Sequence, residues 1–428
     1  MSTAYINARL IDPASGLDTI GAVLVENGTI LDLGAHLFAN GAPSGVETVD
    51  CGGHVLAPGL IDMRVFTGEP GEEHRESLAS ASDAAAAGGV TTFVVMPNTS
   101  PVIDDAALVD FVSRRARDTA SVNVHIMAAL TKGLNGDEMT EIGLLSEAGA
   151  VAFTDGTTAV MNAQLLRRAL TYSKLFNALI VQHAEDPSLA AAGVMNEGEL
   201  STRLGLAGIP TEAETIVVER DLRLVELTGG RYHVSQISCA ETLEVIRQAK
   251  REGLPVTCGV SADHISLNET DIGEYRTFFK LSPPLRSEPD RRAMIEGLAD
   301  GTIDVVVSGH NPQAPDTKRR PFAQAADGAV GLETLLPVML ERVHNEELSL
   351  CEAMACVTSR PADILGLNAG RLAAGAPADM TLIDLGAPWV VEADALRSKS
   401  KNTAHEDRRF QGRALRTIVA GKQVFGTN

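Results

Sequence analysis

The 428-residue sequence predicts an α/β fold, a (β/α)8 barrel (TIM barrel) with a small β-domain built from both ends of the chain. Two observations carry this prediction. Apolar, β-branched runs alternate with helical patterns along the middle of the chain, and such continuous runs are typical of parallel strands buried on both faces. Short β patterns at the two termini are each too small to fold alone, so we expect them to pair. The expected organisation is residues 1–57 and 366–428 in the β-domain, and residues 58–365 in the barrel.

Eight runs have the composition of buried strands, and eight βα units in one block indicate a closed barrel. They are Gly59–Phe66, Thr91–Met96, Val122–Ala128, Ala150–Thr154, Ala178–His183, Arg231–Ile237, Pro255–Val260 and Ile303–Val307. Helical patterns separate them at Glu72–Ala87, Asp104–Arg117, Asn162–Tyr172, Glu212–Leu227, Ala240–Glu252, Asp290–Ala299 and Gly331–Val343.

The terminal β patterns contain clear turn signals. Asn27-Gly28 lies between two apolar runs, and both positions of such a hairpin turn favour positive φ. Near the other end, Asp379–Asp384 and Leu415–Val419 read as strands, and Ala420-Gly421 reads as the turn into Lys422–Phe425.

Composition and charge exclude several classes of function. The net charge of -20 argues against a nucleic-acid-binding or anionic-membrane surface. The five cysteines are scattered without a CxxC pair, so neither a zinc knuckle nor a disulfide framework is indicated. No stretch reaches the ~20 apolar residues of a membrane span. The first residues also lack a charged leader region, and we expect a cytoplasmic protein.

In a barrel of this kind, chemistry is carried by the loops that follow the strands. The first strand runs into Thr67-Gly68-Glu69-Pro70-Gly71, and the second into Pro97-Asn98-Thr99. Asp155-Gly156 follows the fourth strand, and the fifth ends in Gln182-His183-Ala184-Glu185. Later loops hold Ser235-Gln236, Asp263-His264 and Ser308-Gly309-His310.

These segments resemble dihydroorotases of the type found in multienzyme complexes, over nearly the whole chain. The resemblance includes Gly59-Leu60-Ile61-Asp62 and Glu69-Pro70-Gly71 around the first strand, and Gly331-Leu332-Glu333-Thr334 further on. Members of that family of cyclic amidohydrolases interconvert carbamoyl aspartate and dihydroorotate in pyrimidine biosynthesis. They use zinc, which lowers the pKa of bound water and polarises the amide carbonyl.

The family's zinc positions are mostly substituted in this chain. The two histidines of the first strand fall on Arg64 and Phe66, and the histidine of the sixth strand falls on Gln236. The aspartate that serves as ligand and proton shuttle falls on Gly309. Asp155 and His183 survive, so the resemblance implies no catalytic residue and no metal at the old positions.

Substrate recognition is altered as well. The arginine that holds the substrate carboxylate in the family falls on Gly68, whereas Asn98, a substrate contact in the family, remains as a vestigial one. We expect Arg64 to pair with Asp155, because a buried charge must be paired.

These substitutions favour a catalytically inactive dihydroorotase-like protein without a cofactor. The resemblance then implies a structural partner of aspartate transcarbamoylase, and a homo-oligomer. A first alternative is an active dihydroorotase or related cyclic amidohydrolase with a rebuilt site, in which Asp155, His183, His233, His264 and His310 offer zinc three ligands. A second alternative is a small-molecule sensor that uses the old pocket.

Overall fold

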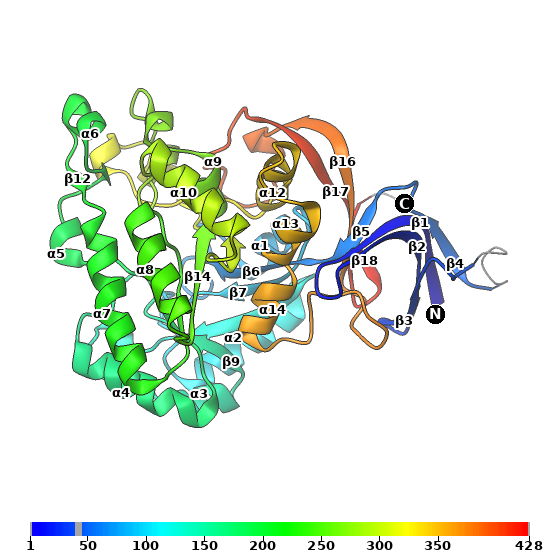
Figure 1. The fold of residues 1–428 in the computed structure, drawn as a ribbon, viewed down its shortest axis with the longest axis horizontal. Coiled ribbons are helices and arrows are strands. Elements are labelled where there is room, and N and C mark those ends of the chain that lie inside the picture. The colour runs from blue at the N-terminus through cyan, green and yellow to red at the C-terminus, as the bar shows by residue number, and fades with distance from the viewer. Residues whose placement is uncertain (1, 39–44, 427–428) are drawn as a thin grey trace.

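The computed structural model describes residues 2–38 and 45–426. It contains a barrel of parallel strands surrounded by helices, and a second sheet that projects from one side and carries both described ends of the chain (Figure 1). The predicted fold class, a (β/α)8 barrel with a β-domain built from both termini, is confirmed.

The barrel strands follow one another around the sheet in chain order, and each falls on one of the eight predicted runs. The last strand returns to the first, where Phe66 N donates to His310 O at 2.9 Å, so the barrel is nearly closed. The barrel strands are β6 Leu60–Val65, β7 Val90–Val95, β8 Asn123–Ala128, β9 Ala150–Phe153, β10 Ile180–Gln182, β13 Tyr232–Val234, β14 Val256–Ser261 and β15 Val305–Val307.

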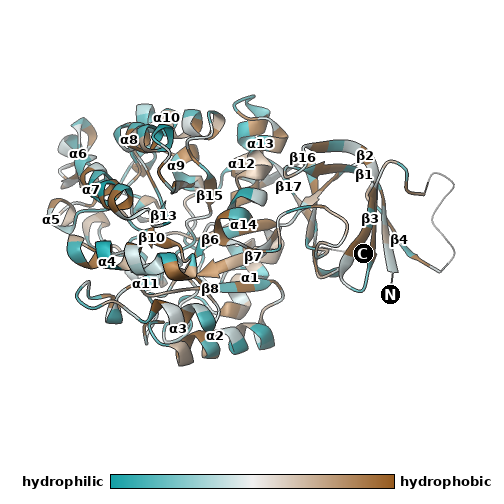
Figure 2. Cartoon of the chain, turned by 60° about the horizontal axis from the view of Figure 1, so that its bottom comes forward, coloured by the Kyte–Doolittle hydropathy of each residue, from teal (hydrophilic) through white to brown (hydrophobic). Residues whose placement is uncertain are grey.

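The outer helices bury one apolar face against these strands. Figure 2 shows mixed hydrophilic and hydrophobic colours on helices such as α2 and α7, as expected for helices between a core and solvent. The longer helices are α1 Leu78–Ala87, α2 Ala106–Thr119, α4 Ala163–Ser173, α7 Glu212–Thr228, α8 Ala240–Arg251, α10 Glu288–Ala299 and α12 Leu335–His344.

The first helix begins later than the sequence predicts. Residues 72–77 form a loop, and α1 starts only after Ser77, whose side chain accepts a hydrogen bond from Ser80 N. The predicted start at Glu72 is wrong because this N-cap and the bonds of Glu76 to a distant loop fix a non-helical backbone there. The extra loop lies at the mouth of the barrel.

The opposite end of the barrel is filled by apolar side chains. Leu365 of α14 (Ser359–Leu365) packs with Met63, Val94 and Val305 from the barrel interior, and all four are buried. The carboxyl ends of the strands are therefore the open end.

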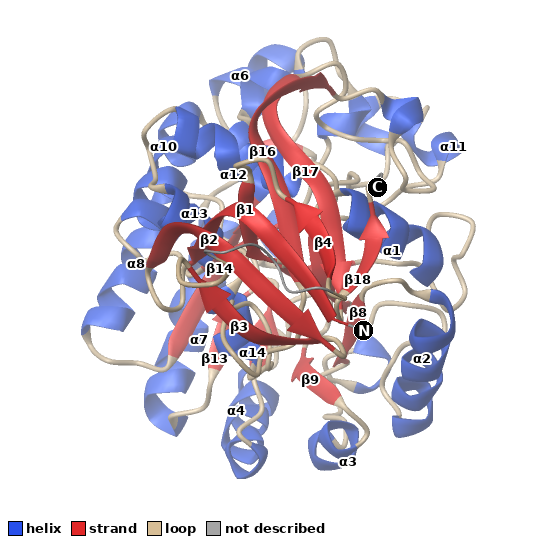
Figure 3. Ribbon diagram, turned by 90° about the vertical axis from the view of Figure 1, so that its right-hand side faces the viewer, coloured by secondary structure: helices blue, strands red, loops and turns tan. Residues whose placement is uncertain are grey.

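The second sheet has the order β18-β17-β16-β5-β1-β2-β3, with β4 paired to β1, and Figure 3 shows it in front of the barrel. At the predicted hairpin, Asn27 and Gly28 have φ of 50° and 83°, and Ala420 and Gly421 have 46° and 73° at the other predicted turn. The strands are β1 Ser2–Asp12, β2 Leu17–Glu26, β3 Thr29–Gly34, β4 Glu47–Asp50, β5 Val55–Pro58, β16 Met380–Val390, β17 Arg409–Val419 and β18 Lys422–Phe425. The exact domain boundaries stay a prediction.

Within the described part of the chain, no helix combines the length and apolar character that crossing a membrane requires.

Candidate active site at the barrel mouth

A polar cavity of about 370 Å³ opens among the loops that follow the barrel strands. A larger depression of about 610 Å³ lies on the outer wall between α7 and α8, and no loop that follows a barrel strand lines it. Because barrel chemistry sits at the carboxyl ends of the strands, the mouth cavity is the candidate site. Its lining includes Arg64, Arg75, Asn98, Glu185, Gln236, Ser261, Asp263, His264, Ser282, Gly309, Asn311, Gln313 and Asp327.

Arg64 extends from β6 into this cavity with 6% of its surface exposed. Its Nε has no hydrogen-bond partner, and no carboxylate of the described residues lies within ion-pair distance of the guanidinium. Burial lowers the pKa of Arg64 to about 10, an effect that the charge of Asp62 opposes, so the group stays cationic at neutral pH. The predicted pair between Arg64 and Asp155 is wrong.

Asp155 instead forms hydrogen bonds with the loop that follows β8. Its carboxylate accepts hydrogen bonds from Leu130 N at 3.1 Å, from Thr131 N at 2.8 Å and from the Thr131 hydroxyl. Burial raises the pKa of Asp155, and these bonds work against that shift. The aspartate therefore ties the loop after β8 to the end of β9.

His183 and Gln236 are buried beside the cavity and incompletely bonded. His183 Nε2 lies 3.3 Å from Ser282 Oγ, whereas its Nδ1 has no partner. Burial, with the charge of Arg64, lowers the pKa of His183 to about 3, so the ring is neutral. Gln236 Oε1 and Asn98 Oδ1 are also buried without a partner.

The other histidines of the mouth are occupied by neighbouring groups. His233 Nδ1 lies 2.8 Å from Thr257 Oγ1, and His264 contacts Ser261 Oγ at 2.6 Å and Pro284 O at 3.1 Å. His310 Nδ1 accepts from Gly331 N at 3.2 Å, so Nδ1 carries no proton.

The substituted positions have been repacked around their new side chains. Phe66 is 4% exposed, and the Arg75 guanidinium lies 4.3 Å from the centre of its ring. Gly68 has φ of 69°, and a Cβ there would lie 2.6 Å from Glu72 O. Gly309 also has φ of 69°, and a Cβ there would lie 3.3 Å from Ser261 Cβ. An arginine at position 68 would require the loop to move.

The donors present do not fit a zinc ion. No group of three or more His, Cys, Asp or Glu side chains suited to a metal occurs within residues 2–38 and 45–426. Of the two surviving ligand positions, Asp155 is bonded to Thr131, and His183 lies close enough to the guanidinium of Arg64 for that charge to lower its pKa. A cationic guanidinium also repels a divalent cation. The rebuilt zinc site expected from Asp155, His183, His233, His264 and His310 is not assembled in the described structure.

Glu185 is a candidate that the sequence reasoning missed. It follows β10, lines the cavity, and its carboxylate accepts no hydrogen bond from the described residues. Burial, with the charges of Asp327 and Glu214, raises its pKa to about 7 against the effect of Arg286. The signal available was its place two residues beyond His183 at the end of a predicted strand.

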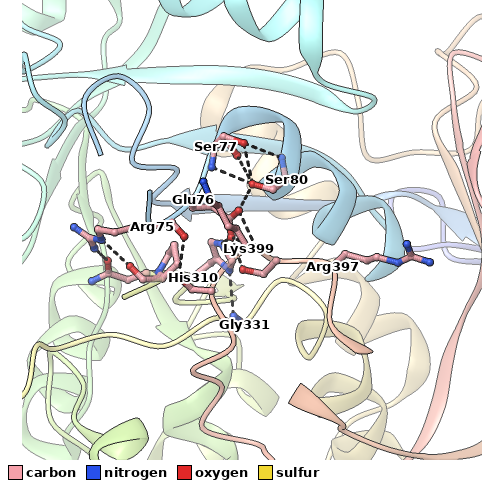
Figure 4. Close-up of polar contacts among 12 residues, drawn as sticks. Arg75, Glu76, Ser77, Ser80, His310, Gly331, Arg397 and Lys399 are labelled. Atoms are coloured by element: carbon pink, nitrogen blue, oxygen red, sulfur yellow. Dashed lines mark hydrogen bonds and ion pairs between the residues drawn. The ribbon is translucent and has the colours of Figure 1, made fainter. Parts of the chain in front are cut away.

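A buried charged cluster around Glu76 lies next to Arg75, which lines the cavity, and Figure 4 shows its polar contacts. Glu76 accepts from the hydroxyls of Ser80 and Ser398 and from Lys399 N, which is 3.1 Å away. His310 Nε2 lies 3.6 Å from Glu76 Oε2. The cluster attaches the segment between β16 and β17 to the loop before α1 and so fixes one wall of the mouth.

Comparisons with known proteins agree on one family. A dihydro-orotase-like family model matches residues 53–242, and an amidohydrolase family model matches residues 323–425. The dihydroorotase of Wolbachia sp. subsp. Brugia malayi is 45% identical over 424 residues, which are 99% of this chain and 95% of the relative. The dihydroorotase of Pelobacter propionicus is 45% identical over 425 residues, or 99% of this chain and 100% of the relative.

Among solved structures, the L-hydantoinase (dihydropyrimidinase) from Arthrobacter aurescens matches with a TM-score of 0.89 and 26% identity. The match covers 99% of this chain and 96% of the hydantoinase.

The expectation of a catalytically inactive protein with a purely structural role is overturned by these relatives. The similarity of the two sequence relatives runs over nearly the whole chain, and both are named as dihydroorotases, which favours the alternative of an active cyclic amidohydrolase. The expectation of inactivity was based only on the substituted ligand positions. It left out Glu185 and the unpartnered polar atoms of the mouth, which a sequence cannot place.

Proposed function

The chain belongs to the dihydroorotase family, and on that premise we propose that it opens or closes a cyclic amide of the dihydroorotate class. The reaction is the reversible hydrolysis of a ring C–N bond. Its proposed place is the cavity at the barrel mouth.

One observation supports this assignment above the others. Three of the buried polar atoms that lack a partner belong to residues that line the cavity, namely Arg64 Nε, Asn98 Oδ1 and Gln236 Oε1. A fourth, His183 Nδ1, belongs to a ring that contacts Ser282 of the lining. Buried polar atoms are normally hydrogen-bonded, and each orphan costs about 1–3 kcal/mol. A ring with amide N–H donors, carbonyl acceptors and a carboxylate offers the partners that these atoms lack.

Glu185 is the group we assign to proton transfer. A general acid–base group works best when its pKa lies near the operating pH, and burial brings Glu185 to about 7. In ring opening, the carboxylate accepts a proton from the water whose oxygen bonds to the ring carbonyl carbon. As the C–N bond breaks, the carboxylic acid returns that proton to the departing nitrogen.

The neutral polar groups of the mouth orient the ring. Asn98 and Gln236 each present a free carbonyl oxygen to accept a ring N–H. His183 is neutral, so its Nδ1 can bond to the ring without adding charge to the site.

The direct test is turnover of dihydroorotate, and cyclisation of carbamoyl aspartate in reverse, by the purified full-length chain. We expect turnover by the native protein, a loss of roughly 10²–10⁴-fold in Glu185→Gln, and no loss in Glu219→Gln on the outer face of α7. Absence of turnover in the native protein, with and without added zinc, would reject the proposed activity.

A chelator provides a second arm of that test. Since the donors of the mouth do not form a metal-binding group, turnover is expected to survive chelation and dialysis. Loss of turnover that returns with zinc would show that the mouth rearranges around a metal. A cytoplasmic location, and association with aspartate transcarbamoylase or with a second copy of the chain, stay predictions.

A further inference from the structure

Arg64 differs in its bonding from the other deeply buried arginines of the described chain. Arg286, 3% exposed, donates to Ser238 Oγ, to Asn196 Oδ1 and to Ile209 O. Arg342, also 3% exposed, pairs with Glu341 and Glu347. Arg64 makes no side-chain hydrogen bond or ion pair with any described residue, although it is almost as buried.

No carboxylate of the described residues, Asp62 and Glu185 included, forms an ion pair with Arg64, although the charge of Asp62 opposes the lowering of the arginine's pKa. Asp263 faces His405 at 3.1 Å, and Asp327 faces Lys280 at 3.8 Å. Asp155 is bonded to the loop after β8. A buried cation without an acceptor is expensive, so its presence in a cavity indicates that an anionic ligand completes the site.

Arg75, the second arginine that lines the cavity, already bonds to other groups of the protein. Arg75 donates to Pro312 O and to Asn311 Oδ1, each at 2.9 Å, and pairs with Glu72 at 2.5 Å. Its guanidinium also stacks on Phe66. Arg64 is therefore the guanidinium of this cavity whose donors are free for a ligand.

We propose that Arg64 binds the carboxylate of the substrate from the floor of the mouth, at a position where the family's pattern has a zinc-binding histidine. It thereby takes over the task of the arginine that the pattern puts at Gly68, where the backbone leaves no room for a side chain. A planar guanidinium matches a carboxylate with two parallel hydrogen bonds, which a lysine or an amide cannot reproduce. The inference rests on the proposed function, because it takes the ligand to be a carboxylated cyclic amide.

The test compares two ligands that differ by one group: dihydroorotate and dihydrouracil, the same ring without the carboxylate. Binding to the full-length protein is measured by calorimetry, with thermal shift as the second readout. We expect the native protein to prefer dihydroorotate, and Arg64→Met to lose about 100-fold in affinity for dihydroorotate while its weaker affinity for dihydrouracil is unchanged. Arg64→Lys should recover part of the loss.

Two controls separate recognition from folding. Arg223→Met removes an exposed arginine of α7 and should bind both ligands as the native protein does. Unchanged dihydrouracil binding by Arg64→Met shows that the cavity is intact in that variant.

The outcomes distinguish this inference from the proposed function. Arg64-dependent binding of dihydroorotate without turnover would leave the carboxylate site standing and reject the activity. Turnover of dihydroorotate by the native protein, with an affinity for dihydroorotate that Arg64→Met does not change, would support the activity and reject the carboxylate site. Equal losses for both ligands in Arg64→Met, or no binding of dihydroorotate by the native protein, would overturn the carboxylate site.

Discussion

Arg64 and Glu76 are buried charged residues of the same βα unit, and they are bonded in opposite ways. Glu76 is completely buried and receives hydrogen bonds from Ser80, Ser398 and Lys399. Arg64 is 6% exposed, faces a cavity and donates no side-chain hydrogen bond to a described residue. Removing a buried charge whose partners all come from the chain leaves those partners unsatisfied and destabilises the fold, whereas a buried charge without partners is stabilised only when a ligand binds.

The same contrast separates the two ends of the barrel. The closed end is filled by apolar side chains such as Met63, Val94 and Leu365, which need no partner. The open end gathers Arg64, Asn98, His183 and Gln236, each with an unsatisfied polar atom. The unpartnered polar atoms that a ligand could bond to are therefore found at the open end of the barrel.

The largest effect is expected from the proton-transfer group of the mouth. Glu185 must be ionised to accept a proton, so hydrolysis by the native protein should rise with pH and level off above about 7. Ring opening returns Glu185 to its ionised form, so by microscopic reversibility ring closure also starts from the ionised carboxylate. Rates measured from pH 5.5 to 8.5 check this, and in Glu185→Gln the residual rate should lose the pH dependence. A native profile that is flat around pH 7 would remove Glu185 from the mechanism.

The next largest effect tests the bonded half of the comparison. Glu76→Ala leaves the donors of Ser398 and Lys399 without an acceptor at the edge of the mouth, and should lower the free energy of unfolding by about 3–5 kcal/mol. Chemical denaturation measures it, with Glu219→Ala on the surface of α7 as the matched control. A loss no larger than that of the control would show that the cluster in Figure 4 does not hold the segment between β16 and β17 in place.

Arg64 should respond in the opposite direction. Arg64→Met replaces an unpaired buried cation by an apolar side chain of similar length, and should raise the free energy of unfolding of the ligand-free protein by roughly 1–4 kcal/mol. Melting curves without ligand check the sign, and dihydroorotate should stabilise the native protein while leaving Arg64→Met unchanged. A destabilised Arg64→Met would mean that the guanidinium supports the barrel instead of a ligand.

The sequence was sufficient for the architecture because the relevant signals are local and repeated. Each barrel strand is a continuous apolar run that reads the same wherever it lies in the chain, as Val305–Val307 illustrates. The start of α1 was misplaced because the alanine-rich pattern up to Ala87 continues the helical periodicity, whereas the bonds that fix Glu76 come from residues 398 and 399.

The site was predictable only as a set of positions. Arg64, Asn98, Gln236 and Gly309, which the resemblance puts at the family's site positions, all line one cavity in the structure. The resemblance could not show that Asp155 is bonded to Thr131 instead of Arg64, because both partners depend on loop geometry of a few ångströms. The raised pKa of Glu185 arises from burial among residues distant in sequence, so no local sequence pattern predicts it.

The smallest expected effect concerns Gly68, where the family's arginine is missing. Gly68 has φ of 69°, and a Cβ there would lie 2.6 Å from Glu72 O and 3.0 Å from Glu76 O. Gly136 has φ of 74° with nothing within 4 Å of a Cβ, so Gly136→Ala reports the cost of the backbone conformation alone, about 1 kcal/mol. Gly68→Ala should cost about 1–2 kcal/mol more, since the loop that carries Glu76 must shift. Equal losses of unfolding free energy for Gly68→Ala and Gly136→Ala in chemical denaturation would mean that the loop can move aside without a cost in stability. An arginine could then be restored at position 68, and the need for Arg64 to bind the carboxylate would lose its structural reason.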